Sequence, residues 1–249
     1  MNVVDRWKRI NEILDKSDYA TVDDLVRSVG ASPATIRRDL KAMESEGMLK
    51  RFHGGAQAIR RGYASALSID KRLSERREAK QAIARKAAAL IEDNDFVYLD
   101  TSSTTYFVPD HLTASNVTII TNSVLLLPKL LKQRVRTYAL GGDVDFEGGA
   151  IMGEDTTEKI KTMNFTKAFI GSYGIDLDYG FTTYSMPESE LKRRIVERSR
   201  RAFVLADSSK FDKSAYYTFG SLQEATVITD AAPEPYLSAG SFVLCENGA

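Results

Sequence analysis

The stretch that decides the N-terminal fold is SPATIRRDL, residues 32–40. Ser32 is a suitable N-cap, and Pro33 suits the first helical position, where its missing N–H leaves no hydrogen bond unmade. Arg37 and Arg38 lie close to this helix start, where the helix dipole disfavours positive charge by up to about 1 kcal/mol. A polyanion beside the helix would reverse that preference.

A second helix is predicted immediately before this one. Thr21 and Asp24 have the spacing of a capping box, and the segment VDDLVRSV ends at Gly30, a common helix stop. The turn between the two helices is therefore about three residues long, which is typical of a helix-turn-helix. The later helix carries its apolar residues on one face: Ile36, Leu40 and Met43.

The segment that follows the helix beginning at Ser32 predicts a wing. Leu49–His53 has the pattern of a short strand, and Gly54–Gly55 that of a tight turn. In a helix-turn-helix the recognition helix enters the major groove, where an arginine can bond a phosphate or the edge of a guanine. The predicted DNA-contacting residues are Ser32, Ala34, Thr35, Arg37, Arg38, Lys41, Arg51 and His53. The alternative is a surface helix whose arginines pair with Asp39 or Glu44.

Charge is distributed unevenly along the 249 residues, although lysines and arginines balance aspartates and glutamates at 34 each. Residues 1–86 have a net charge of +7 and residues 87–249 of −7. A basic front and an acidic back favour polyanion contact at the front. The alternative is a solvated basic helix around residues 71–86.

Composition excludes several classes of protein. No apolar run is long enough to span a bilayer, and the first residues lack a signal-peptide core, so we expect a cytoplasmic protein without membrane contact. The single cysteine, Cys245, excludes an internal disulfide framework. With only two histidines, His53 and His111, no zinc cluster or Cys–His dyad can be assembled from neighbouring motifs. We therefore predict no cofactor and no metal site.

The second half of the chain alternates short apolar runs with segments long enough for helices. This alternation predicts an α/β domain with a mostly parallel sheet. Helices are expected over 75–91, 123–132 and 188–200, and a glycine-rich loop over 141–155. The predicted domains are a winged helix-turn-helix over 1–57, a linker over 58–74 and a sensing domain over 75–249. The predicted strands are Phe96–Leu99, Val117–Ile120, Thr137–Leu140, Lys167–Gly171, Ala202–Ala206 and Thr226–Thr229.

Polar residues follow four of these strands. In a parallel sheet the carboxyl ends gather at one edge, where ligands bind. The segment after Leu99 begins with Asp100, an acceptor for sugar hydroxyls, and continues with four hydroxyl residues that could cradle a phosphate at a helix start. Plain helix capping is the alternative for those hydroxyls. The predicted ligand-binding residues are Asp100, Ser102, Ser103, Thr104, Thr105, Thr121, Asn122, Gly141, Gly142, Gly174, Asp176 and Lys210.

Nearly the whole chain resembles one family, the DeoR-type transcriptional regulators. TIRRDL, GMLKR and HGGA appear in the family's order and spacing, followed by AIARKAAALIEDND, LDTSSTT, TNS, LGGDV, AFIGSYGID and ADSSKF. The resemblance implies a C-terminal domain with the fold of sugar-phosphate isomerases that senses a phosphorylated sugar or related metabolite. It also implies a repressor of a carbohydrate-utilisation operon that binds operator DNA as a homodimer or homotetramer. The family loop usually reads Asp-x-Gly-Thr-Thr, whereas Ser102 occupies the glycine position here.

An enzyme is the competing prediction. A sugar-phosphate isomerase would need a general base, for which Asp100 and Asp176 are candidates, and Lys210 could serve as an electrophile. A binding site needs the same residue types without turnover, so the motifs alone barely separate the two. The attached DNA-binding segment favours sensing, and we predict that the protein is not an enzyme.

Overall fold

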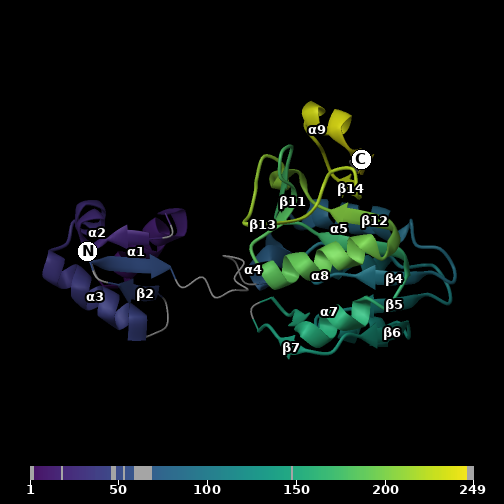
Figure 1. The fold of residues 1–249 in the computed structure, drawn as a ribbon, viewed down its shortest axis with the longest axis horizontal. Helices are drawn as coiled ribbons and strands as arrows, with labels where there is room; N and C mark the ends of the chain where they lie inside the picture. The colour runs from purple at the N-terminus through teal and green to yellow at the C-terminus, as the bar shows by residue number, and fades with distance from the viewer. Residues whose placement is uncertain are drawn as a thin grey trace. The chain divides into compact units, whose positions relative to one another are not determined.

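The computed structural model describes residues 3–17, 19–45, 49–52, 54–58, 69–146 and 148–245, and the chain divides into two compact units, 1–61 and 62–249. Both units are drawn in Figure 1. None of the described helices combines the length and apolar character that crossing a membrane requires.

The first unit is a three-helix domain with a small antiparallel sheet, which confirms the predicted winged helix-turn-helix. The sheet has the order β1-β3-β2, and β2 and β3 form the predicted wing hairpin. The first strand was not expected from the sequence, because three residues carry too little pattern. The elements are α1 (Val3–Ser17), β1 (Tyr19–Thr21), α2 (Val22–Val29), α3 (Pro33–Ser45), β2 (Leu49–Phe52) and β3 (Gly55–Ala58).

The predicted helix boundaries follow from local caps. Thr21 Oγ1 accepts a bond from the Asp24 N–H at 3.1 Å and Asp24 accepts one from the Thr21 N–H, which completes the capping box. Gly30 ends α2 with a φ of 71°, in the left-handed region that favours glycine. Ser32 Oγ accepts a bond from the Thr35 N–H at 3.2 Å and thus caps α3.

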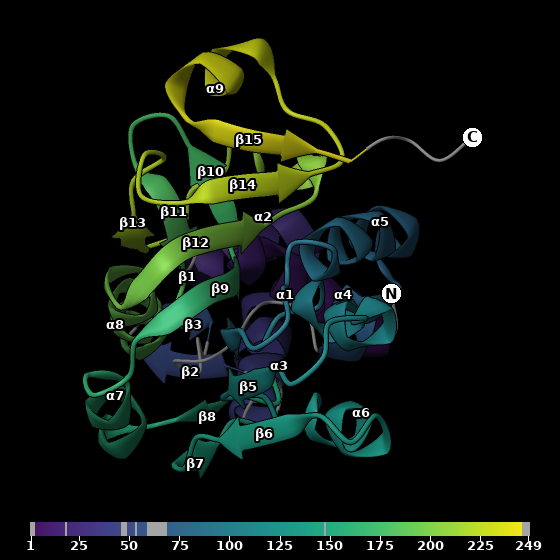
Figure 2. The same ribbon diagram turned by 90° about the vertical axis from the view of Figure 1, so that its right-hand side faces the viewer.

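The second unit is built on a seven-stranded sheet in which every neighbouring pair is parallel, in the order β15-β14-β12-β9-β4-β5-β6. All six predicted strands are present within a few residues of their expected bounds, and β15 is a seventh at the edge. Figure 2 shows the strands of this sheet one above another, from β15 near the top to β6 near the bottom. The strands are β4 (Phe96–Leu99), β5 (Thr118–Thr121), β6 (Arg136–Ala139), β9 (Phe165–Gly171), β12 (Ser199–Leu205), β14 (Thr226–Thr229) and β15 (Ser241–Leu244).

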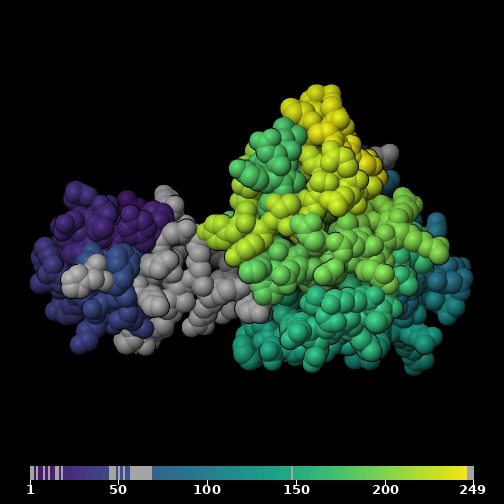
Figure 3. Space-filling view, in the orientation of Figure 1, coloured from purple at the N-terminus to yellow at the C-terminus, as the bar shows by residue number. Residues whose placement is uncertain are grey.

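Helices cover both faces of the sheet. Alternate strand residues point to opposite faces, so Tyr98 and Ile170 pack with α7 (Glu154–Ile160), α8 (Met186–Glu197) and α9 (Glu234–Ala239). Val97 and Phe169 pack on the other face with α5, η1 and α6. In the space-filling view, α7 and α8 form much of the near surface of this unit (Figure 3). The opposite layer consists of α5 (Arg77–Ala88), the 3₁₀ helix η1 (Thr105–His111) and α6 (Leu127–Lys132).

Several segments differ from the sequence-based expectation. The loop expected over 141–155 contains the hairpin β7 (Asp143–Val144) and β8 (Ile151–Met152) and the start of α7. The linker expected over 58–74 ends in α4 (Ile69–Ser74), which is anchored by the buried side chain of Ile69. These elements are too short for a periodic pattern, and long-range packing holds them. A second unexpected feature is a three-stranded antiparallel sheet of β10 (Gly174–Asp176), β11 (Gly180–Thr183) and β13 (Tyr217–Gly220).

Candidate functional site

The outward face of α3 carries most of the predicted DNA-contacting residues. Ile36, Leu40 and Met43 are fully buried in the core of the first unit, and the opposite face of α3 is exposed. Thr35 is half-buried, and its hydroxyl lies 2.9 Å from that of Ser32. The exposed residues are Ser32, Ala34, Arg37, Arg38 and Lys41.

The arginines of α3 are not neutralised by the carboxylates that the sequence offered. Asp39 is 3% exposed and accepts two bonds from Arg6 of α1, at 2.7 and 3.1 Å. In the part of the chain that the structure describes, neither Arg37 nor Arg38 forms an ion pair. The alternative of arginines paired with Asp39 or Glu44 is therefore wrong.

The wing is tied to the recognition helix by Glu44. Its Oε1 accepts a bond from the Arg51 N–H at 2.8 Å, and its Oε2 lies 3.9 Å from the Arg51 Nε. The Arg51 side chain is exposed on β2. Gly55 fits the neighbouring position because a Cβ there would lie 2.4 Å from the Ala20 carbonyl oxygen. His53 lies outside the described residues.

A pocket lies in the second unit where the sheet order reverses. The chain passes from β4 through β5 to β6 on one side, and β9 then returns to the other side of β4. Open α/β sheets bind ligands outside the carboxyl ends of strands at such a switch point. Asp100 and Thr101 follow β4, Asn122 follows β5 and Tyr173 follows β9, and all four line the pocket.

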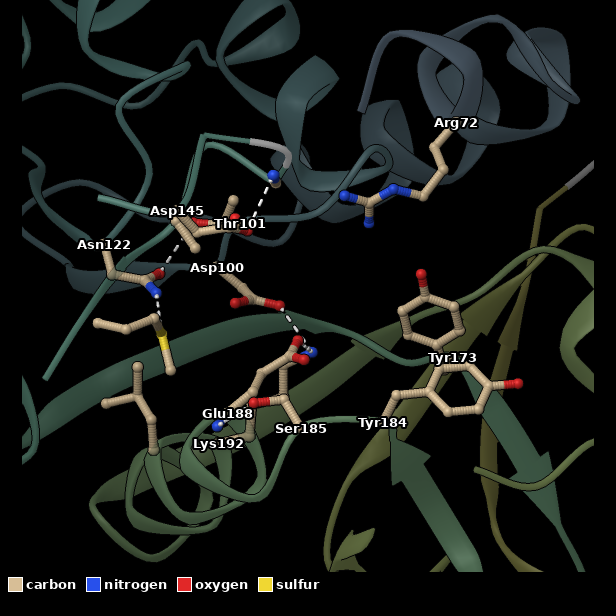
Figure 4. Close-up of a pocket in the computed structure, with 14 residues that line it drawn as sticks. Arg72, Asp100, Thr101, Asn122, Asp145, Tyr173, Tyr184, Ser185, Glu188 and Lys192 are labelled. Atoms are coloured by element: carbon tan, nitrogen blue, oxygen red, sulfur yellow. Dashed lines mark hydrogen bonds and ion pairs between the residues drawn. The ribbon is translucent and has the colours of Figure 1, made fainter. Parts of the chain in front are cut away.

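A buried charge cluster forms one end of the pocket (Figure 4). Lys192 Nζ lies 2.8 Å from Glu188 Oε1 and 3.3 Å from Asp100 Oδ2, and it donates to the Gly171 carbonyl oxygen at 2.7 Å. The Gly171 N–H in turn donates to Asp100 Oδ2 at 2.8 Å. The lysine and both carboxylates thus hold the ends of β4 and β9 against α8.

The cluster shifts the pKa of each member. Burial raises the pKa of Asp100, and the nearby Lys192 opposes that rise without cancelling it. Burial acts the same way on Glu188, but Lys192 and the Thr183 hydroxyl outweigh it, so the pKa of Glu188 is lowered. The two carboxylates also overcome the burial of Lys192 and raise its pKa. The ammonium is therefore held charged and compensated.

Asn122 is fixed beside this cluster. Its Oδ1 accepts bonds from the Tyr98 hydroxyl at 2.8 Å and the Thr101 hydroxyl at 3.2 Å, and its Nδ2 donates to the Ile151 carbonyl oxygen at 3.2 Å. These bonds orient the amide at the carboxyl end of β5. The arrangement of carboxylate, amide, hydroxyl and ammonium suits a polyhydroxylated ligand.

The other end of the pocket is formed by Arg72 of α4 and by Tyr173 and Tyr184, whose rings meet edge to face with centroids 4.8 Å apart. Figure 4 shows these three side chains on the side away from Asn122. Burial raises the pKa of Tyr173 to about 12, although the charge of Arg72 opposes the rise.

The remaining predicted ligand residues do not line this pocket. Ser102 and Thr105 bond each other, because the Thr105 N–H donates to Ser102 Oγ at 3.1 Å and the Ser102 N–H to Thr105 Oγ1 at 3.1 Å. Ser103 and Thr104 are buried in the same loop. Lys210 lies behind the Tyr173 ring, with Nζ 5.8 Å from the ring centroid, and burial lowers its pKa.

Five further predicted residues have structural roles. Thr121 donates to the Leu99 carbonyl oxygen at 2.7 Å. The Gly141 carbonyl oxygen accepts a bond from the Thr156 hydroxyl at 2.6 Å, and Gly142 has a φ of 146°. Asp176 accepts bonds from two backbone N–H groups in the turn after β10, and Gly174 pairs with β11.

Sequence reasoning missed several pocket residues, and one signal was available. Glu188 and Lys192 have i,i+4 spacing on a predicted helix, which normally indicates an exposed ion pair. Nothing local shows that Lys192 is buried. Among the described residues, no group of histidine, cysteine, aspartate and glutamate is arranged to hold a metal ion. The missed residues are Arg72, Thr101, Asp145, Gly148, Ala150, Met152, Tyr173, Tyr184, Ser185, Glu188, Leu191 and Lys192.

Comparison with known proteins gives two family matches. The DeoR-like helix-turn-helix domain matches residues 6–62, and the DeoR C terminal sensor domain matches residues 75–231. The uncharacterized HTH-type transcriptional regulator FruR of Bacillus subtilis is 34% identical over 231 residues, covering 92% of each chain. The glycerol-3-phosphate regulon repressor of Escherichia coli is 30% identical over 237 residues, covering 94% of this chain and 93% of its own.

Solved structures are more distant. Ribose 5-phosphate isomerase A from Neisseria gonorrhoeae covers 54% of this chain and 53% of its own, with a TM-score of 0.39 and 15% identity. That likeness is too low for an inference about activity.

Proposed function

Because the chain belongs to the DeoR family of DNA-binding transcriptional regulators, we propose that it represses genes for carbohydrate use. A phosphorylated sugar or related metabolite would bind the pocket of the second unit and change the affinity of the first unit for its operator. Regulators of this family are not enzymes, so the isomerase alternative is not retained.

The unpaired arginines of α3 carry the DNA-binding part of the proposal. Arg37 and Arg38 are exposed on a capped helix whose opposite face is buried. Their guanidinium groups retain donors for phosphates or for guanine edges. Lys41 and Arg51 add positive charge on the same helix and on the wing, and the proposed contacts also include Ser32, Ala34, Thr35 and His53.

The switch-point pocket supports the sensing part of the proposal. Asp100 offers acceptor oxygens for hydroxyl groups beside the Thr101 hydroxyl, which Asn122 orients, and Lys192 adds a compensated cation. One relative is named as the repressor of a glycerol-3-phosphate regulon. By analogy, the genes under control here would serve the uptake or breakdown of a phosphorylated carbohydrate.

We also propose that the protein acts as a homodimer or homotetramer. A helix-turn-helix reads a short half-site, and two symmetric heads are needed to read an operator with two half-sites. Because the operator lies in the cytoplasm, the proposed place of action is the cytoplasm as well.

Selection of bound duplexes from a random DNA pool tests this function. We expect the full chain to enrich a repeated or palindromic site and to bind it, in a gel shift, at least about a thousandfold more tightly than unrelated DNA. Addition of a panel of sugar phosphates should change that affinity, whereas the unphosphorylated sugars should not. If the pool yields no preferred sequence, the protein is not a sequence-specific regulator.

A further inference from the structure

The pocket has two ends of different charge, and this difference bears on how a ligand lies in it. At one end, Lys192 is compensated by Asp100 and Glu188. An incoming anion would meet two carboxylates there, and a cation already engaged by both. This end therefore suits hydroxyl groups better than a phosphate.

At the opposite end, two buried hydrogen-bond donors have no acceptor within the described chain. Arg72 Nε and the Tyr173 hydroxyl are both buried and have no hydrogen-bond partner among the described residues. Arg72 also forms no ion pair in that part of the chain. Buried donors are normally satisfied, and an orphaned pair that lines a pocket points to an acceptor supplied by a ligand.

The β4–η1 loop is less open to an anion than its sequence suggests. The Ser102 and Thr105 hydroxyls lie 2.9 Å apart, and Thr105 also donates to the Asp100 carbonyl oxygen at 2.7 Å. The pocket reaches this segment only at Asp100 and Thr101. Ser102 packs directly against Gly171, where an added Cβ would lie 2.4 Å from the Ser102 Cβ.

We propose that the phosphate of the effector binds between Arg72 and Tyr173, while its hydroxyl groups bind at Thr101 and the Asp100 cluster. This inference rests on the proposed function of the pocket as the effector site. Arginine presents a planar fork of donors that matches a phosphate, and the neutral Tyr173 hydroxyl adds one more. A phosphate there satisfies both orphaned donors at once.

The position of Arg72 gives α4 a role in sensing. This helix is the first described element after β3 of the DNA-binding unit. The buried Lys80 ammonium of α5 donates to the Arg72 carbonyl oxygen and so links α4 to α5. A phosphate on the Arg72 side chain therefore links occupancy of the pocket to the helix nearest, along the chain, to the DNA-binding unit.

Calorimetric titration of the full chain tests the phosphate position. The parent for all variants carries R37A and R38A, so that the probes do not bind the recognition helix. The probes are inorganic phosphate, glycerol 3-phosphate and glucose 6-phosphate, with glucose as the uncharged comparison. Because hydrogen bonds to charged groups are strong, Arg72→Met should weaken binding of the phosphates by about tenfold or more, and Tyr173→Phe by about threefold or more.

Two further variants separate this site from other sites. Ser102→Ala should change phosphate affinity by less than about twofold, whereas a cradle in the β4–η1 loop predicts a loss comparable with that expected of Arg72→Met. Arg85→Met removes an exposed arginine of α5 outside the pocket and serves as the matched control. Should Arg72→Met lose its cooperative thermal transition, Tyr173→Phe carries the test, because it removes a single oxygen atom.

The outcomes distinguish the inference from the proposed function. Loss of phosphate binding in Ser102→Ala but not in Arg72→Met overturns the inference and leaves the pocket as the effector site. A parent that binds none of the phosphates overturns the inference and the sensing function together. Operator binding is measured separately on the chain with Arg37 and Arg38 intact, so that failure of the DNA-binding function appears on its own.

Hydrogen exchange tests the role of α4. Bound glucose 6-phosphate or glycerol 3-phosphate should slow exchange of the amides of Ile69–Ser74, and Arg72→Met should abolish that protection. Phosphate binding without any added protection of this helix would contradict its part in sensing.

Discussion

The two units of this chain hold their positive charges in opposite ways. On α3 of the first unit, Arg37 and Arg38 are exposed and have no ion pair among the described residues. In the second unit, Lys192 is 3% exposed and lies between two carboxylates. An exposed, unpaired cation remains available to a polyanion, whereas a buried, compensated one fixes geometry. Positive charge is thus available to a binding partner in one unit and fixes positions in the other.

Removal of the compensated Lys192 charge should have the largest effect. Lys192→Met leaves the buried Asp100 and the half-buried Glu188 without their shared cation, which should destabilise the second unit by about 3–5 kcal/mol. Calorimetry should show its transition at lower temperature. Trp7, the only tryptophan, should report an unchanged first unit by fluorescence.

The exposed Lys132 on α6 offers the control for that experiment. Its replacement by methionine should change stability by less than about 0.5 kcal/mol. Equal stability of Lys192→Met and Lys132→Met would contradict the structural role of the Lys192 charge, since the cluster would then contribute nothing to the fold.

A second prediction concerns a neutral group in the same pocket. Burial raises the pKa of Tyr173 from 10.0 to about 12. A raised pKa favours the protonated folded state, so this contribution is present below the ordinary pKa and is lost as the pH rises through about 12. Two pKa units correspond to at most about 2–3 kcal/mol.

Alkaline absorbance titration of the wild type and of Tyr173→Phe measures that shift. The difference between the two curves should be one tyrosinate appearing near pH 12. Arg72→Met should move it higher still, because the arginine charge stabilises the tyrosinate. A difference curve centred near the ordinary value of 10.0 would mean that the pocket does not oppose ionisation.

The third prediction concerns the two arginines of α3 that form no ion pair among the described residues. Arg37→Ala and Arg38→Ala should each weaken operator binding by about 1–3 kcal/mol, measured by gel shift at fixed salt. Arg9→Ala is the matched control, since Arg9 pairs with Glu12 on α1 at 3.1 Å. Unchanged affinity in both α3 variants would remove that helix from the DNA interface.

The smallest expected effect concerns how α3 presents its charges. Ser32→Ala removes the N-cap of the helix and should cost about 1 kcal/mol of stability in the first unit. Urea unfolding followed by Trp7 fluorescence reads this loss directly. Ser28→Ala in α2, an exposed position, should show none.

The sequence predicted the first unit more fully than the second. Capping at Thr21, Gly30 and Ser32 depends on a few neighbouring residues, so helix boundaries could be placed without knowing the fold. In the second unit the strands were found, because buried parallel strands are continuous apolar runs. The hairpin β7–β8 and the sheet β10–β11–β13 were not, because their strands are two to four residues long.

For the candidate site, Asp100 and Asn122 were placed at the sheet edge from the strand ends alone, and both line the pocket. The hydroxyls after Asp100 were placed beside them, but the loop folds so that Ser102 and Thr105 bond each other. Arg72 was assigned to the expected linker, and no local pattern connects it with Tyr173. Which groups share a pocket depends on how distant strands and helices come together. The spacing of residues along the sequence does not encode this arrangement.

Local sequence patterns predicted a winged helix-turn-helix with an arginine-bearing third helix, followed along the chain by a parallel α/β domain. They could do so because capping, periodicity and buried apolar runs are encoded within a few residues. Contacts between distant parts of the chain pair Asp39 with Arg6, bury Lys192 beside Asp100 and Glu188, and bring Arg72 to a pocket. Burial and pairing set the free energy of a charge, and both are fixed by residues that lie far away along the chain.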